Sequence, residues 1–276
     1  MFFQVEISQL LYSHADLFMT HQITQYRYTG STPHAIIAPI VLLNGWGMSA
    51  QIWQTIIPFL QQWTDVVVMD VVYESDVDVL CEKLHKKLCR PCILMGWSLG
   101  GMLATRITVM HPQLVSGLIT LASNAQFVAS DDWPTAMSRE VFSAFHQAYK
   151  DNAEKTLQRF SKLVLQGDVH RRDQKRYLQS LFTSIKTTPQ PLTHYLSGLD
   201  LLRDINNQTA LQKITCPALH CFGESDALVP VQTVEKIQKI NVHHQYEVMA
   251  RSGHLLHMPS KRLEVVLNHF ITEHFL

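Results

Sequence analysis

The chain has 276 residues, with 23 basic and 23 acidic side chains, so its formal net charge is zero. This length suits one large α/β domain, a hydrophobic content of 46% excludes a disordered or fibrous chain, and the neutral total excludes a whole-protein electrostatic footprint for nucleic acid. The first residues lack the basic and apolar regions of a secretory signal, and the longest apolar run is too short to cross a bilayer. We therefore expect a cytoplasmic globular protein.

Short apolar runs alternate with helical patterns in the first half of the chain. Strands are predicted at 23–28, 36–43, 66–70, 93–95 and 118–122, and helices at 49–63, 77–88 and 99–110. Buried strands that alternate with helices are typical of a mostly parallel sheet covered on both faces. The fold class predicted from this rhythm is α/β.

The pattern changes between residues 131 and 206, where only helical periodicities occur. The β/α rhythm then resumes, with strands predicted at 218–222 and 246–249 and a helix from Lys261. We therefore predict one core formed by residues 1–130 and 207–276, with an all-helical lid inserted at 131–206.

One pentapeptide carries the signal of a nucleophile. Gly96-Trp97-Ser98-Leu99-Gly100 matches G-x-S-x-G and stands directly between a predicted strand and a predicted helix. In that context the pattern forms a nucleophile elbow, whose strained turn pushes the serine hydroxyl clear of the sheet. An ordinary strand–helix turn is the alternative. A phosphate-binding loop is poorly supported, because neither glycine-rich phosphate pattern fits.

A serine hydroxyl needs a base, and in this fold the triad runs serine, acid, histidine along the chain. His254 follows the last predicted strand and is the predicted base, with His257 and His220 as its competitors. Asp226 follows the preceding strand and is the predicted acid, which orients the imidazole and stabilises the imidazolium. Glu224 is the competing acid, and a turn-forming or helix-capping aspartate is the structural alternative.

An oxyanion hole requires two preorganised hydrogen-bond donors. The backbone N–H of Leu99, directly after the predicted nucleophile, is expected to be one of them. The loop at 44–47 is expected to supply the second through Trp46. The Trp46 ring would then form an apolar wall beside Ser98, and a core tryptophan is the alternative.

These residues together resemble the α/β-hydrolase superfamily over nearly the whole chain. A closer resemblance is to the pimeloyl-acyl-carrier-protein methyl ester esterases of biotin synthesis, the BioH type. It rests on residues 43–48, 96–101, 122–123, 132–134 and 156–160. The triad motifs are generic in the superfamily, whereas the tryptophan pair Trp46 and Trp97 and the dipeptide Arg159-Phe160 are more specific to the subfamily.

The resemblance implies an α/β-hydrolase fold and a hydrolysis that needs no cofactor and no metal. The family removes the methyl group from the pimeloyl ester carried on acyl carrier protein, through an acyl-enzyme. By resemblance, Ser98 attacks the ester carbonyl, His254 is the base and Asp226 orients it. The residues implied to line an acyl channel under the lid are Phe160, Ser161, Lys162, Leu163 and Val164.

Charge is sorted along the chain. Between residues 155 and 186, eight basic side chains stand against only Asp168 and Asp173, so this segment carries a formal +6 and the remainder −6. Acyl carrier protein is strongly acidic, so a basic lid would steer it. The residues implied by resemblance to meet the carrier are Lys155, Arg159, Arg172 and Arg176. A solvated helix face is the alternative.

Two departures from the family pattern leave the substrate open. Asn44 stands where the family usually has histidine, and residues 71–74 replace the Pro-Gly-x-Gly-x-Ser segment after Asp70. A broad short-chain carboxylesterase, thioesterase or lactonase is therefore the alternative function. A hydrolase-fold protein that binds a ligand without turnover is the third. In each case we expect a monomer that binds neither nucleic acid nor membrane.

The cysteines predict neither disulfides nor a metal centre. Five cysteines form no framework spacing, and the pair Cys89-x-x-Cys92 contains Pro91 and has no second CxxC. Reduced cysteines of a cytoplasmic protein are expected.

Overall fold

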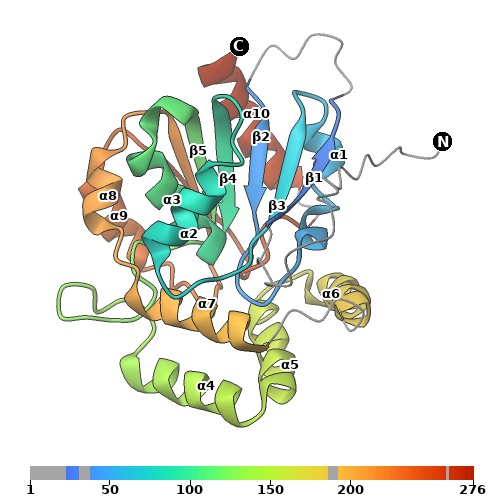
Figure 1. The fold of residues 1–276 in the computed structure, drawn as a ribbon, viewed down its shortest axis with the longest axis vertical. Coiled ribbons are helices and arrows are strands. Elements are labelled where there is room, and N and C mark those ends of the chain that lie inside the picture. Colours follow the sequence, from blue (N-terminus) through green and yellow to red (C-terminus); the bar gives the residue numbers. More distant parts are fainter. Residues whose placement is uncertain (1–22, 31–37, 186–191, 259–260) are drawn as a thin grey trace, which may run out of the picture.

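The structure is a computed structural model that describes residues 23–30, 38–185, 192–258 and 261–276. Its centre is a seven-stranded sheet in the order β1-β3-β2-β4-β5-β6-β7 (Figure 1). The strands are β1 (Thr24–Tyr28), β2 (Ile40–Leu43), β3 (Val66–Asp70), β4 (Cys92–Trp97), β5 (Val115–Leu121), β6 (Ala218–Gly223) and β7 (Gln245–Met249). Strand β1 pairs antiparallel with β3, and the other neighbours are parallel. The predicted parallel sheet is confirmed.

Helices cover both faces of this sheet, with α2 and α3 in front of it and α10 behind it in Figure 1. The helices are α1 (Ile57–Leu60), α2 (Val77–His85), α3 (Leu99–Met110), α4 (Arg139–Asp151), α5 (Ala153–Val164), α6 (Arg171–Ile185), α7 (Leu192–Asp204), α8 (Gln208–Lys213), α9 (Thr233–Ile240) and α10 (Lys261–Phe275). The single-turn 3₁₀ helices are η1 (Ala50–Trp53) and η2 (Pro112–Leu114).

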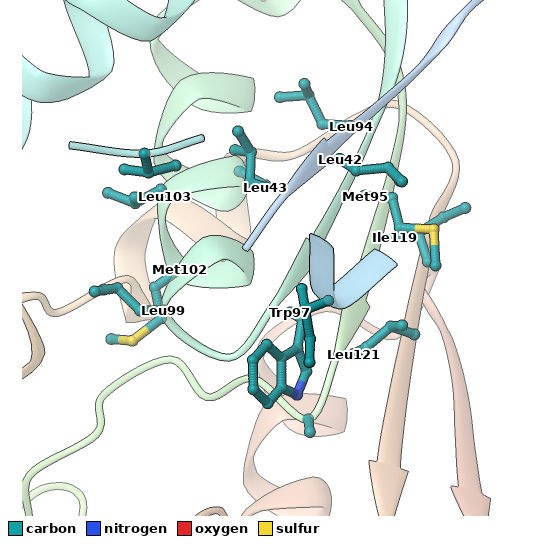
Figure 2. Close-up of a cluster of buried hydrophobic side chains, with 14 of the residues drawn as sticks. Leu42, Leu43, Leu94, Met95, Trp97, Leu99, Met102, Leu103, Ile119 and Leu121 are labelled. Atoms are coloured by element: carbon teal, nitrogen blue, oxygen red, sulfur yellow. The ribbon is translucent and has the colours of Figure 1, made fainter. Parts of the chain in front are cut away.

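The core lies between the central strands and α3. All residues of β2 and β4 are buried, as expected for strands covered on both faces. Leu43 and Leu94 from these strands lie on the same side of the sheet as Leu103 of α3 and pack in one buried cluster with it (Figure 2). This packing holds the first turn of α3 against the carboxyl ends of the strands, where ligand sites of open parallel sheets lie.

The helix expected at 49–63 is wrong. The chain there forms η1 and the four-residue α1, separated by a turn. Pro58 has no N–H, so it cannot donate to the carbonyl four residues earlier and a continuous helix is interrupted. The strand expected at 36–43 begins at Ile40, and residues 36 and 37 lie outside the described residues.

The helical segment between β5 and β6 lies beyond the carboxyl ends of the strands, where Figure 1 shows α4, α5, α6 and α7 below the sheet. We propose that this segment, residues 131–206, is a lid. It is called the helical segment from here on. Among the described residues, no helix is both long and apolar enough to span a membrane.

Candidate active site

Ser98 occupies a strained turn between β4 and α3. Its backbone has φ 55° and ψ −122°, a region that residues with a side chain rarely adopt. The other described non-glycine residues with positive φ are Ala122, which directly follows β5, and Arg251, which lies in the turn after β7. Backbone strain in the described residues therefore gathers at the carboxyl edge of the sheet, as it does at functional sites.

Small residues around Ser98 allow this turn. A Cβ on Gly96 would lie 2.3 Å from the Gly100 carbonyl oxygen, and a Cβ on Gly100 would lie 2.1 Å from the Leu43 carbonyl oxygen. Only glycine lets β4, α3 and the end of β2 approach this closely. The Ser123 hydroxyl donates to the Ser98 carbonyl oxygen at 2.8 Å and ties the turn to the end of β5.

Asp226 and His254 form a buried hydrogen-bonded pair. His254 Nδ1 lies 2.7 Å from Asp226 Oδ2, and both side chains are fully buried. Asp226 Oδ1 accepts the backbone N–H groups of Leu228 and Val229 at 2.8 and 3.0 Å, so the carboxylate is held from its other side. An imidazole held in this way at Nδ1 can use Nε2 as a base.

His254 is joined to the elbow through Trp97. The Trp97 Nε1–H donates to the His254 carbonyl oxygen at 2.8 Å, and the two ring centroids are 5.3 Å apart. His254 Nε2 is buried and has no hydrogen-bond partner among the described residues, so Ser98 and His254 are not hydrogen-bonded in this conformation. Catalytic hydrogen bonds are often long in unliganded enzymes and tighten when substrate binds.

The competing residues have other contacts. His257 packs against the Trp53 and Trp97 rings, and burial, followed by the charge of nearby His254, lowers its pKa to about 3. His220 lies between Thr120 and His244 inside the sheet.

The competing acid Glu224 accepts the backbone N–H of Arg251 at 2.8 Å. Among the described residues, none of these three competitors is hydrogen-bonded to the Asp226 or His254 side chain.

The expected oxyanion donors lie on either side of the elbow. Leu99 opens α3, so its backbone N–H is one of the first-turn amides that have no intrahelical partner. Trp46 lies in the loop after β2, which Asn44 closes: its Nδ2 donates to the Met48 carbonyl oxygen and its Oδ1 accepts the Val71 N–H. Asn44 thus supports the loop at the position where the family usually has histidine.

The Trp46 side chain connects the core to the helical segment. Its Nε1–H donates to the Tyr195 carbonyl oxygen at 2.6 Å. Its ring makes edge-to-face contacts with aromatic side chains of α4, α5 and α7, namely Phe145, Tyr149, Phe160 and Tyr195. Such contacts stabilise a pair by about 0.5–1.5 kcal/mol beyond area burial.

A cavity of about 270 Å³ lies beside Trp46 and the Asp226 loop. Its lining is mainly apolar, with side chains from α4, α5 and α7, and Arg159 is the charged residue among them. Of the five residues implied to line an acyl channel, Phe160 and Leu163 line this cavity, whereas Ser161, Lys162 and Val164 do not. The helical repeat turns the three others away from it.

The implied carrier-docking residues are on two helices of the helical segment. Lys155, Arg159, Arg172 and Arg176 are all solvent-exposed on α5 and α6. Arg176 pairs with Asp173. Lys186, the last basic residue of this segment, lies outside the described residues.

One cluster has the residue types of a metal site. Glu82, His85 and His111 lie at the carboxyl ends of α2 and α3, and each histidine has a nitrogen 3.1 Å from a different Glu82 oxygen. The two imidazole rings are stacked with centroids 3.7 Å apart and an interplanar angle of 13°. Ring lone pairs lie in the ring planes, so in parallel rings they do not converge on one ion. His111 Nε2 is hydrogen-bonded to Glu82, whereas His85 Nδ1 has no hydrogen-bond partner among the described residues.

The Cys89 and Cys92 pair is divided between two environments. Cys89 is exposed and Cys92 is buried, and burial raises the pKa of the Cys92 thiol to about 12. A thiol that stays protonated at neutral pH is a poor metal ligand.

Sequence reasoning missed Tyr73, which lies in the segment that departs from the family pattern. Its side chain is buried and its hydroxyl donates to the Gly45 carbonyl oxygen at 2.9 Å. A Cβ on Gly198 of α7 would lie 2.8 Å from the Tyr73 ring. Tyr73 therefore joins the loop after β2 to the helical segment, and no local sequence signal predicts this contact.

Comparison with known proteins gives the family. A family model described as the alpha/beta hydrolase fold matches residues 74–260. The chain belongs to the α/β-hydrolase family. Among solved structures, an esterase from Exiguobacterium antarcticum is similar, with a TM-score of 0.76 at 20% identity over 90% of this chain and 95% of that chain. The predicted fold class is confirmed.

Curated relatives of this hydrolase carry names from biotin synthesis. A biotin biosynthesis bifunctional protein BioHC of Cellvibrio japonicus is 33% identical over 84% of this chain and 47% of its own length. The chain spans about half the length of the bifunctional relatives it matches. A pimeloyl-acyl-carrier-protein methyl ester esterase of Klebsiella pneumoniae is 31% identical over 73% of this chain and 80% of its own length. The resemblance to BioH-type hydrolases is thereby confirmed.

Proposed function

We propose that this chain is a serine carboxylesterase that hydrolyses the methyl ester of pimeloyl-acyl carrier protein. The observation that supports this chemistry is the buried Asp226–His254 pair together with the strained strand–helix turn at Ser98. Membership in the α/β-hydrolase family and relatives named as esterases support a carboxylic ester hydrolase. The names of these relatives supply the substrate part of the proposal.

In the first half of the reaction, Ser98 Oγ attacks the ester carbonyl while His254 Nε2 accepts its proton. Asp226 keeps the proton on Nδ1 and stabilises the imidazolium. The backbone N–H groups of Leu99 and Trp46 donate to the oxyanion of the tetrahedral intermediate. As this intermediate collapses, the imidazolium returns its proton to the methoxy oxygen, and methanol leaves an acyl-enzyme on Ser98.

Water completes the reaction. His254 takes a proton from the attacking water, and the second tetrahedral intermediate collapses to release the carboxylate and regenerate the Ser98 hydroxyl. No step requires a group from outside the chain and its two substrates. The protein supplies a positioned base, a held acid and fixed dipoles, which are the usual sources of rate in acyl transfer.

The apolar cavity and the basic surface support a carrier-bound acyl chain. Phe160 and Leu163 offer an apolar lining to the methylenes, and Lys155, Arg159, Arg172 and Arg176 on α5 and α6 offer charge complementarity to an acidic carrier protein. A ligand site of this kind, apolar with few polar groups, suits an alkyl chain better than a sugar or a nucleotide.

The test is hydrolysis of pimeloyl-acyl-carrier-protein methyl ester by the purified chain, followed by intact-protein mass spectrometry of the carrier. We expect the carrier to lose the mass of one methylene, and we expect the Ser98→Ala variant to leave it unchanged. Rapid hydrolysis of free short-chain esters with no activity on the carrier-bound ester would instead support the broad esterase. No labelling of Ser98 by a fluorophosphonate would support a binding protein.

A further inference from the structure

The loop between α5 and α6, residues 165–170, packs against both loops that flank the proposed acid and base. Gly167 in this α5–α6 loop has φ 82°, and a Cβ there would lie 2.2 Å from the carbonyl oxygen of Ser225, directly before the acid. The Val169 N–H donates to the Arg251 carbonyl oxygen at 3.1 Å, shortly before the base. Only glycine fits this close approach at positive φ.

Asp168, at the centre of the α5–α6 loop, reaches the residue next to the proposed base. Its Oδ2 accepts the Gly253 N–H at 2.8 Å, and its Oδ1 accepts the His170 N–H at 2.6 Å. The residue is 6% exposed. Behind it, Gln174 of α6 donates its side-chain N–H to the Leu255 carbonyl oxygen at 3.2 Å. The amide before His254 and the carbonyl after it are thus both held by the helical segment.

The charge of Asp168 is unusual for its place in the chain. It is one of two acidic residues in the basic stretch 155–186. The other, Asp173, pairs with Arg176, whereas Asp168 forms no ion pair with any residue that the structure describes. Burying a carboxylate costs free energy unless its oxygens are hydrogen-bonded. The two oxygens of Asp168 accept hydrogen bonds from two backbone amides. Charge-assisted bonds of this kind are about twice as strong as neutral ones.

We infer that Asp168 is a positioning residue for catalysis: by holding the Gly253 amide it keeps the His254 ring aligned between Asp226 and Ser98. Because α5 and α6 carry the basic surface and are joined directly to this loop, Asp168 also couples the helical segment to the base. The inference rests on the proposed function, since it gives His254 the role of base.

The expected effect on the rate follows from geometry. Displacing a catalytic group by about 1 Å can cost on the order of 100-fold. Asp168 accepts a hydrogen bond from the amide of Gly253, the residue directly before His254. We therefore expect Asp168→Ala to lower kcat on a small p-nitrophenyl ester by about 10- to 100-fold, with little change in KM, because such an ester does not need the basic surface.

Three variants separate positioning from charge and from folding. Asp168→Asn keeps one acceptor oxygen and should retain more activity than Asp168→Ala. Asp173→Asn is the matched control, because it removes an exposed acid from the same helical region, and we expect its kcat to stay within about twofold of the parent. If Asp168→Ala does not fold, Asp168→Asn carries the test alone.

Two readouts respond to imidazole alignment and not to the folded fraction. In Asp168→Ala the acidic limb of the pH–kcat/KM profile should move to lower pH, because the imidazolium is held less well by Asp226. The downfield ¹H NMR resonance of the His254 Nδ1–H, assigned by its loss in His254→Gln, should move upfield or broaden. A smaller folded fraction would lower the amplitude of both signals and leave their positions unchanged.

The outcomes are distinct. Unchanged kcat, or a loss that matches the folded fraction with no shift of profile or resonance, overturns the positioning role. If the parent chain hydrolyses no ester and Ser98 is not labelled, the proposed function fails, and the NMR resonance alone then decides whether Asp168 aligns His254. A shifted resonance in Asp168→Ala with an unchanged one in Asp173→Asn shows in either case that Asp168 aligns His254, and it supports the catalytic positioning role when the parent chain hydrolyses esters.

Discussion

The carboxyl edge of the sheet and the helical segment meet around one cavity but use their polar groups in opposite ways. At the edge, Ser98, Asp226 and His254 are at most 8% exposed, and backbone hydrogen bonds or close backbone contacts set their positions. On the helical segment, the basic side chains of α5 and α6 face solvent. Bond-making groups need alignment within fractions of an ångström, whereas long-range steering of a charged partner does not.

Three of the polar contacts that join the two regions lie next to the proposed catalytic residues. The Trp46 Nε1–H reaches Tyr195 of α7, Asp168 reaches Gly253, and Gln174 reaches Leu255. Substitutions in the edge should therefore affect every ester, while substitutions on the exposed surface should affect only carrier-bound ones. The predictions below test that division from the largest expected effect to the smallest.

The largest effect is expected for Ser98→Ala. Removing a triad nucleophile typically lowers kcat by more than about 10⁴-fold, because the remaining triad members have nothing to activate. The loss should be the same for carrier-bound and free esters. Thermal melting should be unchanged or slightly higher, since the hydroxyl is not needed to hold the turn. Steady-state kinetics on both substrates, with melting as the control, measures this, and a selective loss on one substrate would contradict the proposed role.

A smaller and selective effect is expected for the double variant Lys155→Glu/Arg172→Glu, which changes two exposed residues of α5 and α6 that do not line the cavity. Reversing two charges on the basic surface should raise KM for pimeloyl-acyl-carrier-protein methyl ester by about 10-fold or more at low salt, mainly through slower association. Hydrolysis of a p-nitrophenyl ester should change little. The difference between parent and variant should shrink as ionic strength rises, because salt screens exposed charges.

The matched control for this surface is Lys213→Glu/Lys239→Glu. Both lysines are exposed on α8 and α9, and neither forms an ion pair with a described residue, so the double variant makes the same change in net charge elsewhere. If it weakens the carrier-bound reaction as much as the first pair does, the effect belongs to net charge and not to a docking surface.

How far the sequence predicts this molecule differs between the two regions for the same physical reason. The strands and α3 follow from local periodicity, and the expected bounds of α3 at 99–110 are those observed. The helix predicted at 49–63 is interrupted near Pro58. The prediction followed the apolar spacing of this segment and gave too little weight to the proline. In the helical segment, periodicity predicts helices but not which face meets the core. The resemblance implied a continuous run of channel residues, and Ser161 and Lys162 of that run do not line the cavity.

The partners of Asp168 and Tyr73 could not be predicted from the sequence. Each bonds a backbone group of a loop distant in the chain, Gly253 in one case and Gly45 in the other. A backbone amide or carbonyl has no sequence signature, because every residue supplies one apart from the missing amide of proline. Contacts of this type therefore become visible only once the fold brings the loops together.

A narrower effect is expected from filling the cavity. Leu163 lines it and is half-buried, so Leu163→Trp adds volume at the lining without touching the edge of the sheet. We expect rates on medium-chain p-nitrophenyl esters to fall by roughly 10-fold, in the range that one or two methylenes are worth in an apolar pocket. Acetyl ester hydrolysis should be retained. Lys162→Met, an adjacent change off the cavity lining, is the control, and an equal loss on all chain lengths would contradict an acyl-binding role for the cavity.

The smallest expected effect concerns the free energy of unfolding at acidic pH. We expect buried histidines near the carboxyl edge of the sheet to make the largest contribution to its pH dependence. Burial lowers the pKa of His257 to about 3, against an ordinary value near 6.5. Between these two values the unfolded chain binds a proton that the folded chain does not. The free energy of unfolding therefore falls as pH decreases from about 6.5 toward about 3, by up to roughly 1.4 kcal/mol per pH unit for one such histidine.

The variant His257→Gln removes this titration while keeping a side chain of similar polarity. The stability of this variant at pH 7 should be lower, because packing against the Trp53 ring is lost. Its free energy of unfolding should nevertheless fall less steeply between pH 6 and pH 4 than that of the parent. The exposed His269 provides the control, since His269→Gln should leave the slope unchanged. Urea denaturation at several pH values measures both slopes, and parallel declines in parent and His257→Gln would show that acid lability arises elsewhere, for example at His220, whose pKa burial lowers in the same way.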